Sequence, residues 1–332
     1  MNTIKILPLS ILLSFVIACT KTTSPVPEIS VSTDPNIGCT DPLAKNYKAT
    51  AKEEDCGCQY DYTSAVSTKI PSNFTQNILV EQHTGTWCGY CPMGKEAMSE
   101  AIKSPRVVGL EIHYDDEMAN MDKIYTPLKN KFGHPAFPTG MVNRKKSIIG
   151  STILMGADKR TINGARTTEW QANIDAYLKT EKSSYGIALE SKLTGNDLQV
   201  MTHVNFQLST ADKYGLGVYL VENDVTGYPQ LNYLSNYNIF QEYASYKLPS
   251  EIQDIKHHNV ARDAIAAIDN GIEIPLAATN YSKTYHKLFK ITLPSSVKNA
   301  ANCKIIAFIV NRKTNEIINV QQADINKVVS WQ

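Results

Sequence analysis

The feature that most constrains the fold is a pair of cysteines at the point where an apolar run gives way to a helical pattern. Residues 78–80 predict a strand, and the run Trp87-Cys88-Gly89-Tyr90-Cys91-Pro92 then leads into a helix. Two thiols at this spacing form a tight disulfide. At a helix N-terminus, the unpaired backbone N–H groups and the helix dipole also favour a thiolate at the first cysteine. The spacing therefore pairs Cys88 with Cys91.

Residues 1–18 have the composition of a secretory signal. Lys5 is their single charge, and the apolar run that follows is too short to span a bilayer. The run ends at Val16-Ile17-Ala18-Cys19, which resembles the lipobox of bacterial lipoproteins, where the cysteine is acylated. An ordinary signal peptide cleaved elsewhere is the alternative. We expect lipid on Cys19 to hold the exported chain at a membrane.

The residues after Cys19 and the charge balance limit where the protein can be located and what it can bind. Thr20 after the cysteine resembles lipoproteins sorted to the outer membrane, and no acidic cluster follows it, which favours the periplasmic face over the cell surface. Residues 19–36 are rich in Thr, Ser and Pro and predict a flexible tether. The mature chain carries 32 basic and 32 acidic residues, so it has no electrostatic footprint for nucleic acid. No second apolar run is long enough to span a membrane, so attachment depends on the lipid.

Six cysteines remain once Cys19 is acylated, an even number in an oxidising compartment. Four of them lie outside the Cys88–Cys91 motif and allow three connectivities, among which the sequence does not choose. These four are Cys39, Cys56, Cys58 and Cys303. Zinc held by the two closely spaced pairs is the alternative, but exported thiols are more often oxidised than metallated, and Cys56 and Cys58 lack the usual spacer. We expect no metal and no other cofactor.

Residues 37–62 form a short Cys-rich stretch. Gly38-Cys39-Thr40-Asp41-Pro42, followed by Asn46-Tyr47 and Cys58-Gln59-Tyr60, resembles a Cys-bounded module that recurs in exported proteins of bacteria with this kind of lipoprotein. The resemblance implies a Cys39–Cys58 bond, while the extra Cys56 departs from the pattern and leaves the assignment open. Three acidic residues could supply oxygen ligands for calcium. Their spacing does not follow an ordered ligand pattern, so the favoured interpretation is a solvated knob held by one disulfide. They are Asp41, Glu54 and Asp55.

Residues 63–182 alternate between strand and helix patterns. Strands at 78–80 and 107–112, helices at 92–102 and 124–132, two antiparallel strands at 133–144 and 147–149, and a helix at 170–178 follow in order. This order resembles the thioredoxin topology. Phe137-Pro138-Thr139 lies where thioredoxin-like proteins place a cis-proline against the cysteine pair, and a trans proline in a loop is the alternative. The resemblance implies that Pro138 presents an edge to an extended substrate chain.

Residues 183–332 show alternating patterns with turn signals between them, as in the segment from Leu198 to Leu208. They predict an all-β, immunoglobulin-like sandwich of about seven strands. The chain is thus expected to hold a disulfide-stapled module, an α/β thioredoxin-like domain and this sandwich. His257 and His258 are adjacent and so point to opposite faces of an extended segment, which makes them a poor metal pair. We interpret them as packing and hydrogen-bonding residues, and a role at the interface between the domains is the alternative.

The lipobox, the motif from Glu81 to Pro92, the motif from Phe137 to Arg144 and the β-rich second half together resemble one known family. It is the family of outer-membrane lipoproteins named for a twenty-eight-kilodalton member, and the resemblance covers about residues 74–330. The family implies a lipid-anchored protein of the outer membrane. Its name does not state an activity, so the function must be inferred from the site.

From the site we predict a membrane-anchored thiol-disulfide oxidoreductase of reductase or isomerase type, acting on thiols or disulfides of exported proteins. Cys88 would attack and Cys91 would release the mixed disulfide. Trp87 would limit water, and Glu81, or less favourably His83, would be a buried acid or base for Cys91. The alternative is a non-catalytic outer-membrane lipoprotein with a static Cys88–Cys91 disulfide that binds or supports an envelope protein or polymer.

Overall fold

The computed structural model describes residues 34–279 and 283–331. The signal peptide, Cys19 and most of the predicted tether lie outside the described residues. The described part is mostly β-sheet with few helices, and a disulfide holds its N-terminal region. None of its helices is both long and apolar enough to cross a membrane.

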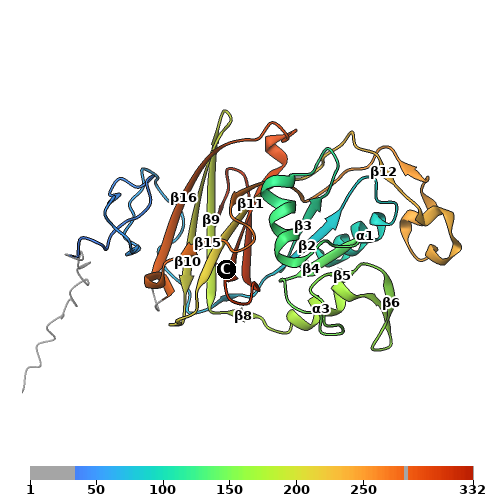
Figure 1. Ribbon diagram of the computed structural model, residues 1–332, viewed down its shortest axis with the longest axis horizontal. Helices are drawn as coiled ribbons and strands as arrows, with labels where there is room; N and C mark the ends of the chain where they lie inside the picture. The colour runs from blue at the N-terminus through green and yellow to red at the C-terminus, as the bar shows by residue number, and fades with distance from the viewer. Residues whose placement is uncertain (1–33, 280–282, 332) are drawn as a thin grey trace, which may run out of the picture.

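A nine-stranded sheet runs through both halves of the chain (Figure 1). Its strands in spatial order are β18 (Ile317–Asp324), β17 (Cys303–Asn311), β11 (Tyr214–Glu222), β14 (Val260–Ala266), β3 (Val107–His113), β2 (Ile78–Thr84), β4 (Thr139–Val142) and β5 (Met155–Gly156), with β15 (Ile272–Ile274) paired to β11. The halves meet where β14 runs parallel to β3, with Val260 opposite Glu111. This shared sheet was not predicted from the sequence, and the domain boundaries at 62/63 and 182/183 stay predictions.

The first half contains all three α-helices of the described residues. These are α1 (Cys91–Ala101), α2 (Thr126–Phe132), which continues a π-helical turn η1 (Met121–Tyr125), and α3 (Glu169–Tyr177). A hairpin of β6 (Lys159–Ile162) and β7 (Ala165–Thr168) lies between β5 and α3. Val80, Met98 and Trp170 belong to a core between the sheet and the helices α1 and α3. On the other face, Leu128 of α2 packs with Leu79 and Phe308, so this core joins both halves.

One predicted strand is misplaced. The pattern at residues 147–149 predicted the second strand of an antiparallel pair, but the structure places β5 at Met155–Gly156. Ser147 makes a local turn instead, because its Oγ accepts hydrogen bonds from the backbone N–H groups of Ile149 and Gly150. Ile148 and Ile149 are consequently exposed.

A second, four-stranded sheet covers one face of the second half (Figure 1). Its order is β16 (Thr284–Thr292), β10 (Asp197–Phe206), β9 (Tyr185–Thr194) and β19 (Val328–Val329). The alternating residues Leu198, Val200 and Val204 of β10 point into a core with Leu216 of β11 and Ile305 of β17. The alternation of apolar and polar residues is therefore explained by a sheet that packs on one side against another sheet.

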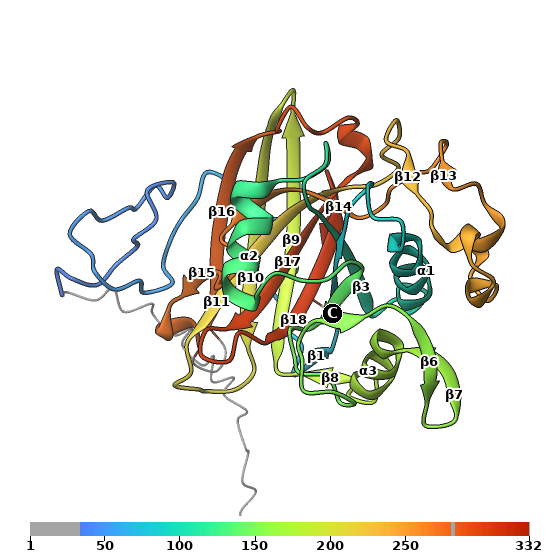
Figure 2. The ribbon, with the colours of Figure 1, turned by 45° about the vertical axis from the view of Figure 1, so that its right-hand side comes forward.

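Short elements complete the fold. β1 (Phe74–Thr75) pairs with β8 (Lys182–Ser183), and η5 (Leu276–Thr279) and η6 (Ala300–Asn302) are single 3₁₀ turns. Residues 228–252 form an excursion between β11 and β14, which we term the capping segment. It holds β12 (Gln230–Leu231), the 3₁₀ turns η2 (Leu234–Asn236), η3 (Asn238–Phe240) and η4 (Ala244–Lys247), and β13 (Glu251–Ile252). Figure 2 shows this orange segment beside α1.

The close approach of Trp170 to β4 gives a first prediction. A Cβ at Gly140 would lie 2.6 Å from atoms of the fully buried Trp170 ring. We expect Gly140→Ala to lower the free energy of unfolding by about 1–3 kcal/mol, because the ring must leave its packed position. Urea unfolding measures the change. Gly150→Ala is the matched control, since its nearest neighbour would lie 3.4 Å away, and an equal loss in both variants would contradict the packing argument.

Candidate functional site

The Cys88–Cys91 disulfide lies between the end of β2 and the start of α1, as the spacing predicted. The turn is held by its own backbone: Cys88 N donates to the Gly85 carbonyl at 3.1 Å, and Cys91 N donates to the Cys88 carbonyl at 3.0 Å. Pro92 occupies the first turn of α1, where a missing N–H group costs nothing. Cys88 is 5% exposed and Cys91 is 0% exposed.

Pro138 follows a cis peptide bond with Phe137. It packs beside α1, since a Cβ at Gly94 would lie 2.9 Å from the Cβ of Pro138. The structure thus brings Pro138 to the helix that begins at Cys91.

The capping segment covers the cysteine turn. Nε2 of the fully buried Gln230 donates to the carbonyl oxygens of Gly85 and Thr86, each at 3.1 Å, and of Cys88 at 3.0 Å. The backbone continues the contact, because Leu231 N donates to the Thr86 carbonyl at 2.9 Å. This segment comes from the second half of the chain and was not part of the predicted site.

Tyr233 closes the top of the turn. Its N–H donates to the Gly89 carbonyl at 2.7 Å, and its ring lies so close that a Cβ at Gly89 would come within 2.3 Å of it. Tyr90, the other residue between the cysteines, packs edge-to-face on the Tyr233 ring at 5.7 Å between centroids. A chain approaching the disulfide from this side would have to displace Tyr233.

Glu81 forms a buried ion pair with Arg144. The guanidinium donates twice, from Nε to Oε2 at 2.7 Å and from Nη2 to Oε1 at 2.6 Å, and the Tyr219 hydroxyl donates to Oε1 at 2.8 Å. Burial lowers the pKa of Arg144, but the Glu81 carboxylate outweighs it and raises this pKa above its ordinary value. Burial and then Glu81 raise the pKa of Tyr219. The hydrogen-bond partners of Glu81 are therefore Arg144 and Tyr219 rather than the cysteines.

His83 and Trp87 have different surroundings. His83 is buried, and burial lowers the pKa of its imidazole to about 4, so the ring is neutral at physiological pH. Trp87 is 41% exposed; its Nε1 donates to the Tyr114 carbonyl at 2.8 Å, and its ring packs on Phe137 at 5.3 Å between centroids. Trp87 thus belongs to an aromatic surface beside the cis-proline.

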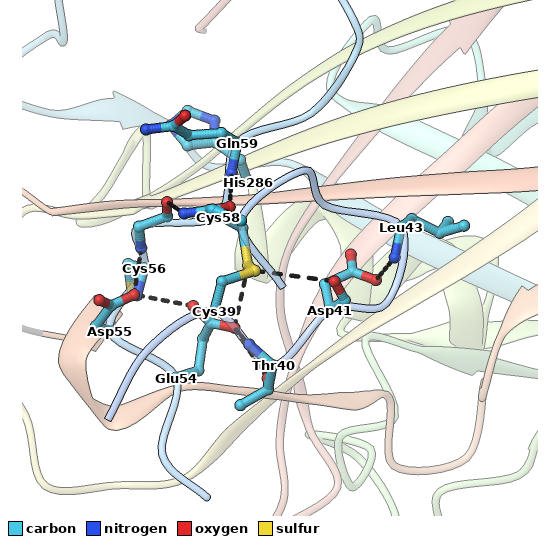
Figure 3. The surroundings of a disulfide bond; sticks show 12 residues. Cys39, Thr40, Asp41, Leu43, Glu54, Asp55, Cys56, Cys58, Gln59 and His286 are labelled. Atoms are coloured by element: carbon cyan, nitrogen blue, oxygen red, sulfur yellow. Dashed lines mark hydrogen bonds between the residues drawn. A yellow bond between two sulfur atoms is a disulfide. The ribbon is translucent and has the colours of Figure 1, made fainter. Parts of the chain in front are cut away.

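The N-terminal module contains the Cys39–Cys58 disulfide that the module resemblance implied (Figure 3). Asp41 accepts a hydrogen bond from the Tyr60 hydroxyl at 2.6 Å and pairs with Lys287 at 2.8 Å. Burial raises the pKa of Asp41, but these two partners outweigh it and lower the pKa below its ordinary value. Since Lys287 is on β16, this pair attaches the module to the four-stranded sheet.

Glu54 and Asp55, the other two candidate calcium ligands, accept hydrogen bonds from the module's own backbone. Glu54 accepts from the N–H groups of Thr40 and Cys56, and Asp55 accepts from the N–H of Gly57 (Figure 3). These hydrogen bonds agree better with the interpretation as a knob held by one disulfide than with a calcium site.

Cys56 and Cys303 are free thiols. Burial raises the pKa of each to about 12, so neither is a thiolate at neutral pH. The zinc alternative fails for the described residues that it named, because Cys58, Cys88 and Cys91 are all in disulfides.

A buried polar cluster beneath α1 was not predicted from the sequence. Glu111 and His113 lie on β3, and the buried His257 precedes β14; one ligand atom of each lies within 4.8 Å of the others. Burial raises the pKa of Glu111, but Lys95 and then His113 outweigh it and lower this pKa to about 2, so the carboxylate is ionised. The alternation Glu111-x-His113, which places both side chains on one strand face, was the available signal.

Residues 126–329 match the family model described as outer membrane protein Omp28. A comparison with curated proteins finds no significant match. HBP35 of Porphyromonas gingivalis is 18% identical, with 76% of each chain covered and a TM-score of 0.55, which is a likeness of fold alone. A domain of the outer membrane lipoprotein Omp28 from the same organism is 19% identical over 45% of this chain and 92% of its own, with a TM-score of 0.28.

The prediction of a thiol-disulfide oxidoreductase is wrong. The family match is to an outer membrane protein, and it begins at residue 126, after the whole of the Cys88–Cys91 motif. The structure gives a physical reason in agreement with this, because thiol-disulfide exchange needs an accessible sulfur atom and both sulfur-bearing residues are covered.

The Glu81–Arg144 pair gives a second prediction. Both side chains are 0% exposed, so Glu81→Gln leaves a guanidinium buried without its counter-charge. We expect the variant to lose about 3–5 kcal/mol of unfolding free energy, measured by urea unfolding. Lys103→Ala, which removes an exposed ion pair with Glu100, is the control and should change little. Equal stability of Glu81→Gln and wild type would contradict the structural role of the pair.

Proposed function

The chain belongs to the Omp28 family of outer membrane proteins, and from this premise we propose that it is a non-catalytic lipoprotein with a binding or structural role. In this proposal Cys88–Cys91 is a static disulfide that fixes the start of α1. The observation that carries the proposal is the hydrogen-bonded capping segment over the cysteine turn. A turn held by another part of the chain is suited to a permanent cross-link.

The energetic argument concerns what opening would cost. Gln230 is fully buried, and its Nε2 is shared among three carbonyl oxygens of the turn. Lifting the capping segment would leave those carbonyls and the Gln230 amide without partners until water replaced them. It would also expose Leu234 and Tyr243, which pack with Met93 of α1 in a small apolar core. Reduction of the disulfide would therefore be coupled to unfolding of this segment.

For the finer architecture we propose a thioredoxin-like arrangement in the first half and an immunoglobulin-like sandwich in the second. The sheet order β3-β2-β4-β5, the helices between these strands and the cis bond before Pro138 support the first part. The packing of β10 against β11 and β17 supports the second. A fold of this kind does not by itself determine an activity, so it is compatible with a scaffold.

The binding role is supported by exposed apolar side chains on the capping segment. Tyr237 and Ile239 are 53% and 77% exposed, and Tyr233 and Leu248 are also exposed, next to Tyr90 at the cysteine turn. Aromatic residues with few charges are typical of the buried part of protein interfaces. We propose an envelope protein or polymer as the partner, contacted by this face while lipid on Cys19 holds the chain at the periplasmic face of the outer membrane.

The reactivity of the disulfide tests this function and is the third prediction. The folded protein is incubated in a dithiol buffer poised near thioredoxin, at about −270 mV, and free thiols are alkylated and counted by mass spectrometry. We expect Cys88–Cys91 to stay oxidised in the folded protein and to be reduced after unfolding in urea. A second arm uses Cys91→Ser in cells: envelope proteins trapped on Cys88 as mixed disulfides would refute the non-catalytic proposal.

A fourth prediction isolates the capping segment. Gln230→Ala removes the amide that spans the turn, so we expect the disulfide to be reduced faster, by at least about tenfold if the lost hydrogen bonds are worth about 1.4 kcal/mol or more. Gln253→Ala is the matched control, because that amide bonds only the nearby Glu251 in an exposed position. Equal reduction rates for wild type and both variants would show that the segment does not protect the disulfide.

A further inference from the structure

Three metal-ligating side chains converge beneath α1, where β14 joins β3. Glu111, His113 and His257 each place one ligand atom within 4.8 Å of those of the other two, and all three residues are buried. We propose that this group, the β3–β14 cluster, binds one divalent transition-metal ion of the Zn²⁺ class. Two imidazoles and one carboxylate are a common ligand set for such an ion. The inference goes beyond the proposed function and does not depend on it.

The hydrogen bonds behind the histidines fix which nitrogens face the cluster. His257 Nε2 lies 2.8 Å from the Tyr228 carbonyl, which can only accept, so Nε2 carries a proton and the neutral ring presents the lone pair of Nδ1. His113 Nδ1 lies 2.7 Å from the Asp116 carboxylate, which leaves Nε2 facing the cluster. A carboxylate or carbonyl behind each ligating imidazole is the arrangement that orients histidines in metal sites.

His113 Nε2 supplies an independent observation. The side chain is 0% exposed, yet this nitrogen has no hydrogen-bond partner in the described structure. The nearest oxygen of Glu111 is 3.7 Å away, beyond hydrogen-bond distance. At this distance Glu111 interacts with the nitrogen only electrostatically, and a buried polar atom without a hydrogen-bond partner is rare in folded proteins. A metal ion bound by the three ligand atoms would satisfy it.

A cation already occupies part of this position. Lys95 Nζ lies 3.0 Å from Glu111 Oε2 and 3.1 Å from His257 Nδ1, so the ammonium interacts with two of the three ligands. Lys95 extends from α1 and lines a cavity of about 430 Å³ that Glu111 and Asp254 also line. Its flexible side chain can turn into this cavity, where Asp254 offers a carboxylate. We therefore infer that the metal ion and the Lys95 ammonium compete for one site.

The distances indicate how far the ligands must move. Zinc bonds nitrogen and oxygen at about 2.0–2.2 Å, so ligand atoms around a tetrahedral ion lie about 3.3 Å apart. The widest separation within the 4.8 Å limit must therefore shorten by up to about 1.5 Å, which side-chain rotation can supply once Lys95 leaves. Because β3 belongs to the first half and His257 to the segment that enters β14, a bound ion would link the two halves where the sheet is continuous. The ion would act as a cross-link.

Metal titration of the full chain in detergent, after removal of adventitious metal with a chelator, is the fifth prediction. Zn²⁺ affinity is measured by competition with a chromogenic chelator, and Co²⁺ gives the visible absorption of a low-coordinate ion. We expect one ion per chain and a higher melting temperature with Zn²⁺. Glu111→Gln and His257→Gln should weaken binding by at least about tenfold, and Asp116→Ala by about tenfold through loss of the acceptor behind His113.

Two further variants distinguish binding at the buried cluster from binding at a surface histidine. His258→Gln is the matched control for His257→Gln, because His258 is its exposed neighbour and should leave the affinity unchanged. Lys95→Met removes the competing ammonium, so we expect Zn²⁺ affinity to rise by at least about tenfold if displacement costs about 1.4 kcal/mol or more. This gain cannot be produced by misfolding.

The proposal is overturned if neither wild type nor Lys95→Met binds one Zn²⁺ per chain. It is also overturned if His258→Gln abolishes binding while His257→Gln leaves it intact, since the metal would then be held at the surface. Circular dichroism of each variant without metal shows that the fold is retained. If Glu111→Gln or His257→Gln does not fold, the Lys95→Met titration decides.

Discussion

The buried bridge between Glu81 and Arg144 is the interaction on which the joint between the two halves depends. Removing two charges from water is costly, and the cost is offset only when the geometry and the surrounding hydrogen bonds are good. Here the carboxylate receives both guanidinium bonds and the Tyr219 hydroxyl, and Arg144 Nη1 donates to the Ile268 carbonyl at 2.7 Å. Glu81 belongs to β2 and Tyr219 to β11, so one network contacts both halves of the sheet.

The backbone is adapted to this bridge. Asn143 and Arg144 follow β4 and both have positive φ, at 50° and 53°. Asparagine tolerates this region better than most residues, and its Oδ1 accepts a hydrogen bond from Leu79 N at 2.8 Å. Arg144 adopts the same conformation at some cost, which is offset by the Glu81 pair and by the Phe308 ring 5.0 Å from the guanidinium carbon. The Asn-Arg pair of the sequence motif is therefore explained by the turn and by the bridge.

How much the sequence could predict follows from the range of the interactions. The helix beginning at Cys91 and the strands β2 and β3 depend on local periodicity and on Pro92, and the patterns located them. The cover over the cysteines depends on Gln230 and Tyr233. Gln230 is more than 140 residues from Cys88 along the chain, and no local sequence pattern predicts contacts over such a separation. The partner of Glu81 could not be predicted for the same reason, because an Arg after a short strand does not indicate which carboxylate it pairs with.

The surroundings of His257 could not be predicted for a related reason. Adjacent His257 and His258 lie in different environments, the first buried and the second exposed. The true neighbours of His257 are Glu111 and His113, which come together only because β14 runs beside β3. The connection from β11 to β14 thus supplies both the capping segment and His257. That one stretch of chain covers the disulfide and contributes His257 to the β3–β14 cluster, and α1 contacts both, through Met93 in the first case and Lys95 in the second.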